Sequence, residues 1–112
     1  MRQYTNEYQT AKLIELGFEK PCSIASVEPI YGMGGISVTK AYNIGELIEM
    51  LPEAVCLSND DSVHYYLEIS SNTLYWNVAY KDGSYEAYSI ESDELIDALW
   101  VMIVKLKEEG VI

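Results

Sequence analysis

The chain has 112 residues, of which 49% are hydrophobic and 22% charged, and its 18 acidic and 7 basic side chains give a formal net charge of −11 at pH 7. This apolar content excludes a disordered acidic tail, and the length predicts one domain, residues 1–112, with one hydrophobic core. Nucleic acid and anionic membranes are poor partners for such a chain, because its charge repels phosphate. The net charge falls entirely in residues 41–112.

The first predicted element is a helix capped by Thr5, and Gly17 stands where a helix commonly ends in a left-handed residue. A second, short helix is predicted after Asn43. Glu46, three residues later, completes a capping-box pattern, and Pro52 ends the segment. The N-terminal part of the chain is therefore expected to supply two short helices.

Between these helices, two short apolar runs at 24–27 and 36–42 are separated by Pro29 and a glycine-rich segment at 32–35. Because proline and glycine interrupt regular structure, the runs predict an irregular hairpin. The glycines do not form a phosphate-binding loop, since neither a Gly-Lys-Ser/Thr ending nor a third spaced glycine follows them. We interpret the glycine-rich segment as a turn.

A period-two alternation of apolar and polar residues begins at Val63, after a predicted turn at 59–62. The alternation predicts a three-stranded antiparallel meander whose two-residue loops are Ser71-Asn72 and Asp82-Gly83. Asp-Gly is the stronger of these two hairpin signals. The second hairpin is therefore the better defined by sequence.

Pairing across the predicted loops places Leu67 opposite Trp76 and Val78 opposite Ala87, which makes one face of the meander almost wholly apolar. The other face is predicted to be polar with an aromatic band. Its residues are His64, Tyr66, Glu68, Tyr75, Asn77, Ala79, Glu86, Tyr88 and Ile90.

The last predicted element is a helix capped by Ser92 and running to about Glu109, with an apolar stripe at helical spacing. Such a stripe needs a cover, and the apolar face of the meander supplies one. The sequence therefore predicts an α+β fold. It combines a three-stranded antiparallel meander, the C-terminal helix on its apolar face, two short N-terminal helices and an extra hairpin.

No set of residues predicts catalysis, a cofactor site or a metal site. His64 is the only histidine, and Cys22 and Cys56 lack the close spacing of metal ligands. We expect both cysteines to be buried, reduced thiols. The chain has no signal-peptide pattern, and its longest apolar stretch, at 98–104, is too short for a bilayer. These features predict a cytoplasmic protein that is not an enzyme.

Ten tyrosines in 112 residues are the feature that most favours binding. Tyrosine offers a large contact area at a small entropic cost and is enriched in binding surfaces. Tyr66, Tyr75 and Tyr88, with His64 and Glu68, therefore form the predicted partner surface. The competing interpretation is that the N-terminal helices cover this face and make the tyrosines a second core layer.

Three strings carry a resemblance: TAKLIELGFEKP at 10–21, YNIGELIEMLP at 42–52 and DELIDALWVMIVKLKEEGVI at 93–112. They resemble short uncharacterised proteins encoded by phages and mobile elements of gut bacteria of the Bacteroides group. The strings are helix cores and caps, so the resemblance implies no activity and no site residue. It implies a mobile-element setting in a bacterial cytoplasm.

The leading hypothesis is a non-enzymatic protein that binds a protein partner or itself through the tyrosine-bearing face. The alternative is an acidic inhibitor, either an immunity protein or a mimic of DNA charge, since a negative face speeds association with a basic groove. A third class, an enzyme acting on a small ligand, requires a concave pocket with convergent polar groups.

Overall fold

The computed structural model describes residues 1–32, 34–56 and 63–112, which form three helices and two antiparallel sheets. The helices are α1 (Glu7–Glu15), α2 (Ile44–Met50) and α3 (Leu95–Glu108). The small sheet pairs β1 (Ile24–Pro29) with β2 (Ile36–Lys40). The main sheet has the order β3 (Ala54–Val55), β4 (Tyr65–Ser71), β5 (Trp76–Asp82) and β6 (Tyr85–Ser92).

The α+β class predicted from sequence is confirmed, but the main sheet has four strands rather than three. The additional strand, β3, pairs with the start of β4 at the edge of the sheet. The two residues of β3 are too few to show a period-two pattern. The turn predicted at 59–62 lies outside the described residues.

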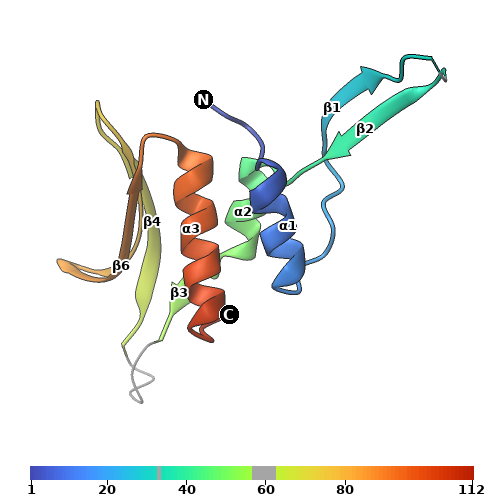
Figure 1. The fold of residues 1–112 in the computed structure, drawn as a ribbon. Coiled ribbons are helices and arrows are strands. Elements are labelled where there is room, and N and C mark those ends of the chain that lie inside the picture. Colours follow the sequence, from blue (N-terminus) through green and yellow to red (C-terminus); the bar gives the residue numbers. More distant parts are fainter. Residues whose placement is uncertain (33, 57–62) are drawn as a thin grey trace.

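Helix α3 lies between the main sheet and the other two helices (Figure 1). It contacts β5 and β6 on one side and α2 on the other. On the α1 side, Trp100 Nε1 donates to the carbonyl of Gln9 at 3.1 Å. Because the helix is covered from two directions, apolar residues are buried over a broad part of its circumference. These are Leu95, Ile96, Ala98, Leu99, Met102, Ile103 and Leu106.

Helix α1 is capped by Asn6 and not by Thr5. The Asn6 side chain accepts from Gln9 N at 2.8 Å, and Gln9 Oε1 accepts from Asn6 N at 3.0 Å, which completes a capping box. Thr5 is buried and accepts from Tyr42 N at 3.1 Å. Both residue types suit an N-cap, so the long-range bond to Tyr42 decides between them. Gly17 has a φ of 99°, as predicted for the residue after the helix.

The capping box predicted for α2 is confirmed. Asn43 Oδ1 accepts from Glu46 N at 2.8 Å, and Glu46 Oε1 accepts from Asn43 N at 3.0 Å. Both partners also contact Ser23, just before β1. The Ser23 hydroxyl donates to Glu46 Oε1 at 2.6 Å and accepts from Asn43 Nδ2 at 3.2 Å. The cap of α2 therefore also fixes the start of β1.

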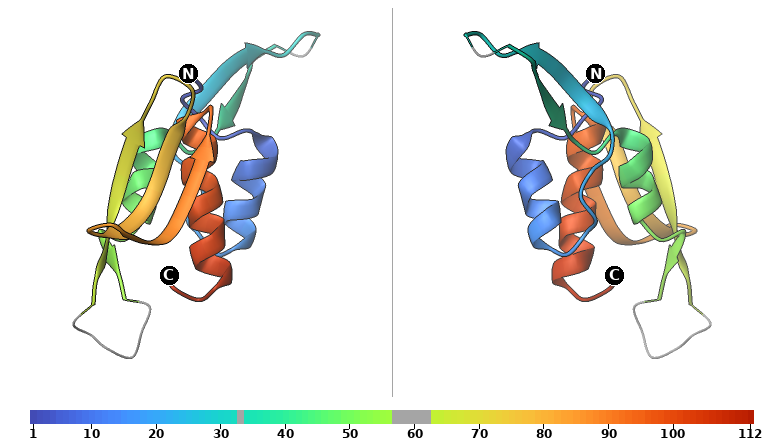
Figure 2. Two further views of the ribbon diagram at one scale, coloured as in Figure 1. Left: turned by 90° about the vertical axis from the view of Figure 1, so that its left-hand side faces the viewer. Right: turned by 90° about the vertical axis from the view of Figure 1, so that its right-hand side faces the viewer.

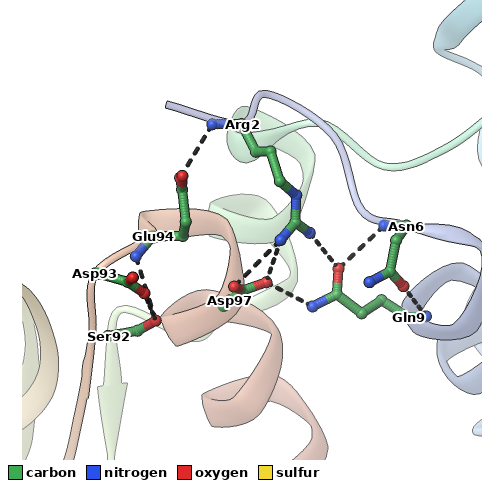
Figure 3. A network of polar contacts seen from close by, with 7 residues as sticks. All are labelled: Arg2, Asn6, Gln9, Ser92, Asp93, Glu94 and Asp97. Atoms are coloured by element: carbon green, nitrogen blue, oxygen red, sulfur yellow. Dashed lines mark hydrogen bonds and ion pairs between the residues drawn. The ribbon is translucent and has the colours of Figure 1, made fainter.

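The residue predicted to cap α3, Ser92, does not occupy the N-cap position. Glu94 occupies it without a side-chain capping bond, and Ser92 Oγ accepts from Glu94 N at 3.3 Å. The start of α3 is instead held by the N-terminal segment, because Arg2 N donates to Glu94 Oε2 at 3.0 Å (Figure 3). A local sequence pattern cannot predict this contact, because residues 2 and 94 are far apart in the sequence.

A polar network joins the N-terminal segment and α1 to α3 (Figure 3). The Arg2 guanidinium lies 3.0 Å from the Asp97 carboxylate and donates to Gln9 Oε1 at 2.8 Å. Gln9 Nε2 donates to Asp97 Oδ1 at 2.7 Å, and Gln9 is only 6% exposed. The amide of Gln9 thus completes both the cap of α1 and the contact with α3.

The first hairpin of the main sheet has a longer loop than predicted. Leu67 pairs with Tyr80, and Ser71 with Trp76, so the loop spans 72–75. Asn72 Oδ1 accepts from the backbone amides of Leu74 and Tyr75 at 2.8 and 2.9 Å. This turn, formed by an asparagine side chain, replaces the predicted loop at 71–72. The register moves by an even number of residues, so β4 and β5 keep the faces predicted for them.

The second hairpin differs from its prediction in two ways. Asp82 pairs with Tyr85, so the loop is Gly83-Ser84 rather than Asp82-Gly83. The pairing of β5 with β6 then shifts between Tyr80 and Lys81 of β5. Opposite this point, β6 contains one extra residue, at position 87. Such a bulge moves every later side chain of the strand to the opposite face. The face predicted for the second half of β6 is therefore wrong.

We expect Gly83→Ala to lower the free energy of unfolding by about 1–2 kcal/mol, the usual cost of a left-handed alanine. Gly83 has a φ of 61°, and an added Cβ would meet nothing within 4 Å, so the cost is conformational. Gly45→Ala in α2 is the matched control and should be neutral or stabilise by up to about 1 kcal/mol. Urea denaturation measures both. Equal effects of the two substitutions would contradict the turn geometry.

Candidate functional site

The face of the main sheet that points away from α3 is not covered by a helix (Figure 2). All three helices lie on the opposite side of the sheet, with α1 and α2 beyond α3 (Figures 1 and 2). We call the uncovered side the outer face. Strand register gives it Tyr66, Glu68, Ser70, Asn77, Ala79, Lys81, Glu86, Ser89 and Glu91. The N-terminal helices therefore do not bury the predicted partner surface.

Three of the five predicted partner-surface residues lie together at the start of β4. Tyr66 is 59% exposed, and its ring centroid lies 6.4 Å from that of His64. Glu68 follows on the same face and is also exposed. These side chains form a small accessible patch at one end of the outer face.

Tyr75 lies away from this patch. It is in the loop between β4 and β5, next to the pair of Ser71 with Trp76, whereas Tyr66 pairs with Lys81 at the other end of the ladder. Five strand residues separate the two ends, which is about 16 Å. Tyr75 is half-buried and lines a shallow hollow of about 290 Å³ together with Asn77 and Ser89.

Tyr88 lies on the opposite face of the sheet from Tyr66. It pairs with the buried Tyr80 and packs against the core. Lys105 Nζ of α3 lies 5.4 Å from the Tyr88 ring centroid. Burial raises the pKa of the Tyr88 phenol, and the Glu109 carboxylate adds to this effect. The bulge at position 87 causes the change of face of Tyr88. Together with the placement of Tyr75 in the loop, it means that the predicted band of three tyrosines does not form.

The remainder of the outer face has the composition of a solvated surface. Hydroxyl, amide and carboxylate groups alternate there, and Lys81 is paired with Glu86 at 3.4 Å. One face of an antiparallel sheet is commonly exposed to water. Exposure of this polar face therefore needs no bound partner to account for it.

A second uncovered surface lies on the β1–β2 hairpin, residues 24–40, which we call the arm. The arm extends away from the helices and the main sheet (Figures 1 and 2). The molecule measures 61 × 34 × 17 Å, with a radius of gyration of 16.6 Å. A compact chain of this length would have a radius of gyration of about 13 Å. The arm contributes to this elongation.

The two faces of the arm differ in chemistry. Val27 pairs with Val38, Pro29 with Ile36, and Ile24 with Lys40. Because these pairs alternate with the others along the ladder, their side chains share one face. We call the side that carries Ile24, Val27, Pro29, Ile36 and Val38 the apolar face of the arm; Lys40, the partner of Ile24, lies on the same side at the base. The opposite face carries Ser26, Glu28, Ser37 and Thr39.

The apolar face of the arm is exposed along its length. The exposed fractions are 54% for Ile24, 52% for Val27, 62% for Ile36 and 42% for Val38. An amphipathic strand pair normally places its apolar side against another layer. No helix or strand in the part of the chain that the structure describes provides such a layer. The arm therefore carries a contiguous aliphatic surface in contact with water.

Hydrogen bonds fix the base of the arm. Ala41 N donates to the Ser23 carbonyl at 3.1 Å, and the Ser23 side chain is held by the cap of α2 as described above. At the far end, Ile30 N donates to the Gly35 carbonyl at 3.2 Å, and Tyr31 is 90% exposed. The described residues of the arm, 24–32 and 34–40, thus form a hairpin with an anchored base and an exposed tyrosine near its tip.

The irregular hairpin is predicted from sequence, but the exposure of its apolar face is not. The alternation of Ile36, Ser37, Val38 and Thr39 already indicates one apolar and one polar face. A sequence pattern gives the sidedness of a strand but not what covers it. The sequence therefore indicated that the arm has an apolar face, but it could not indicate that this face is exposed.

The described residues show no further clustering that indicates chemistry. Within 1–32, 34–56 and 63–112, no group of three or more His, Cys, Asp and Glu side chains is placed to hold a metal ion. Cys22 and Cys56 are both exposed, which corrects the expectation that they are buried. In the part of the chain that the structure describes, no helix has the length and apolarity needed to span a membrane.

Comparison with protein-family models, with curated proteins and with solved structures finds no match to this chain. The function of the two surfaces must therefore follow from their own geometry and chemistry. The outer face of the main sheet is polar and solvated, whereas the arm exposes aliphatic side chains. Of the two, only the arm carries a surface that water disfavours.

Proposed function

We propose that this chain is a non-enzymatic protein that acts by binding protein through the apolar face of the arm. A single observation carries the proposal: a two-stranded hairpin extends from the molecule with one aliphatic face uncovered. Contiguous exposed apolar surface marks interaction sites in soluble proteins. The partner surface proposed here thus differs from the tyrosine-bearing surface predicted from sequence.

The apolar face is large enough to contribute to binding. Full burial of a Val or Ile side chain is worth about 1.5–3 kcal/mol, and Ile24, Val27, Ile36 and Val38 are each about half exposed. Covering all four therefore gains roughly 3–6 kcal/mol before the costs of association are subtracted. This gain supports a reversible complex.

The arm also benefits from a partner. A two-stranded hairpin alone is at best marginally stable in water, and the arm has no second layer of its own. A protein packed on the apolar face supplies that layer. Binding and ordering of the arm are then coupled, which makes the arm a natural element for association.

The acidic-inhibitor alternative receives less support from the placement of the acids. Asp97 and Glu94 at the start of α3 are contacted by Arg2, and Glu108 near its end lies 3.8 Å from Lys12. Glu86 on the outer face is paired with Lys81. Because these acids have partners within the chain, part of the negative charge has a structural role. We do not advance inhibition as a second function.

The setting of the proposed activity follows from the sequence resemblance and stays part of the proposal. The chain would act in the cytoplasm of a Bacteroides-group bacterium that carries a phage or mobile element. A lysate of such a bacterium is therefore the appropriate source of partners.

The proposal is tested by capture on the immobilised chain at low and high salt, with two single variants. Ile36→Lys places a charge on the apolar face, and Ser37→Lys places the same charge on the polar face of the same strand. We expect protein captured by the wild type to be retained in high salt, since apolar contacts are not screened. We expect capture to be lost with Ile36→Lys and kept with Ser37→Lys.

Capture that is unaffected by Ile36→Lys would contradict the proposal. Capture that disappears in high salt with all three chains would indicate an acidic surface and a basic partner, and would also contradict it.

A further inference from the structure

We infer that the partner of the arm is a second copy of this chain, and that two arms pack apolar face against apolar face around a two-fold axis. This inference rests on the proposed function and names its partner. It commits to one arrangement, in which the same side chains of both copies form the contact.

Charge is the first argument for a second copy. The net charge of −11 falls in residues 41–112, whereas the arm contains one acid, Glu28, and one base, Lys40. Two copies of an acidic protein repel each other through most of their surface. The arm is the part of the chain that two copies can bring together with the least repulsion.

The same balance of charge argues against other partners. A basic protein or a nucleic acid is recognised by complementary charge, and the arm offers no excess of either sign. Apart from Lys40 at its base, the apolar face carries no charged side chain, and it is complementary to another face of the same kind. The chain itself carries such a face on every copy.

The sidedness of the arm is the second argument and selects the mode of packing. Joining two arms edge to edge would extend the ribbon but leave both apolar faces in water. Packing them face to face buries Val27 and Val38 of both copies between two layers about 10 Å apart, and leaves Glu28 and Ser37 facing solvent. Only the second mode removes the exposed aliphatic surface.

The size of the contact sets its strength. A standard protein interface uses about 20–30 residues on each side, far more than the five residues of the apolar face. The dimer formed by the arms is therefore reversible and depends on concentration. Because each residue occurs twice in a two-fold contact, a single substitution has a doubled effect.

Sedimentation velocity of the full chain, from about 5 to 500 µM, tests the inference, because micromolar affinity is the range expected for a small interface. The apparent mass of the wild type should rise above 12.7 kDa with concentration. Ile36→Lys should stay monomeric, with a dissociation constant at least about tenfold higher, and Ser37→Lys should match the wild type within about twofold. Far-UV circular dichroism checks that both variants keep their secondary structure.

Salt gives a further readout. Raising the salt concentration from about 0.05 to 0.5 M should strengthen the dimer, because it screens the repulsion between the acidic bodies and leaves apolar contacts intact. A dimer that weakens in salt would overturn the inference, as would a dimer that Ile36→Lys leaves unchanged.

The outcomes separate this inference from the proposed function. A wild-type chain that stays monomeric up to about 500 µM overturns self-association, since binding weaker than that is not a specific interface. In that case, capture of a different protein that is sensitive to Ile36→Lys leaves the proposed function standing. Monomeric behaviour without such capture overturns both.

Discussion

Gln9→Glu is expected to lower the free energy of unfolding at pH 7 by about 2–3 kcal/mol. Gln9 is only 6% exposed, and its Nε2 donates to Asp97 Oδ1 at 2.7 Å. The substitution keeps the shape of the side chain but replaces this donor with a carboxylate oxygen. Two carboxylates are then held at hydrogen-bond distance, one of them at the buried position 9, and Arg2 offsets only part of their repulsion.

Chemical denaturation at pH 7 and at about pH 4 measures this effect, because the pKa of a glutamate carboxyl such as the introduced one is ordinarily about 4.3. The loss of unfolding free energy caused by Gln9→Glu should be smaller at about pH 4, where a protonated carboxyl again donates a hydrogen bond. Gln3→Glu, at an exposed position, adds the same charge and is the control. Equal stability of the two variants at pH 7 would show that the network of Figure 3 does not hold α1 to α3.

Ionisation of Tyr80 is expected to lower the free energy of unfolding progressively between pH 10 and pH 12. Burial raises the pKa of its phenol from 10.0 to about 12, and the side chain is 0% exposed. The folded state therefore holds the proton more tightly than the unfolded state. Its contribution to stability is complete below pH 10 and is lost as the pH rises to 12. A difference of this size corresponds to about 2–3 kcal/mol.

Tyr80→Phe separates this effect from other alkaline transitions. At pH 7 the variant should be about 1 kcal/mol less stable, because the Tyr80 hydroxyl donates to the Pro52 carbonyl at 2.7 Å. Its stability should then fall less steeply than that of the wild type between pH 10 and pH 12. Urea denaturation across this range measures both slopes, and parallel slopes would contradict the role given to Tyr80.

Local sequence patterns predicted those parts of the fold that local chemistry decides. Asn43 and Glu46 form the predicted capping box, and Gly17 has the predicted left-handed conformation. The predictions of Thr5 and Ser92 as caps were wrong because contacts with Tyr42 and Arg2, distant in sequence, determine those helix starts. Caps can be read from sequence where no distant partner competes.

Two local features separate the three tyrosines that the sequence places on one face: Tyr75 lies in the longer loop between β4 and β5, and a bulge in β6 displaces Tyr88. The segment after Gly83 alternates in a way that fits a regular strand, and nothing in it marks position 87 as the extra residue. One unpaired residue moved Tyr88 from the outer face to the core face. Tyr66, His64 and Glu68 kept their predicted face because the register error in the first hairpin was an even number of residues.

The exposure of the arm is a feature that a local sequence pattern cannot predict. Its hairpin and its two chemically distinct faces follow from the sequence, but its exposure depends on where the rest of the chain packs. Helix α3 takes the apolar face of the main sheet, and α1 and α2 pack beyond α3 (Figure 2). No helix or strand among the described residues covers the arm.

Site-specific photo-crosslinking tests most directly whether this chain associates through the apolar face of the arm. A benzophenone amino acid is placed singly at position 36 on the apolar face, at 37 on the polar face, and at 66 on the outer face of the main sheet. We predict crosslinked adducts from position 36 and none from 37 or 66. Adducts from position 66, or equal adducts from 36 and 37, would contradict the claim.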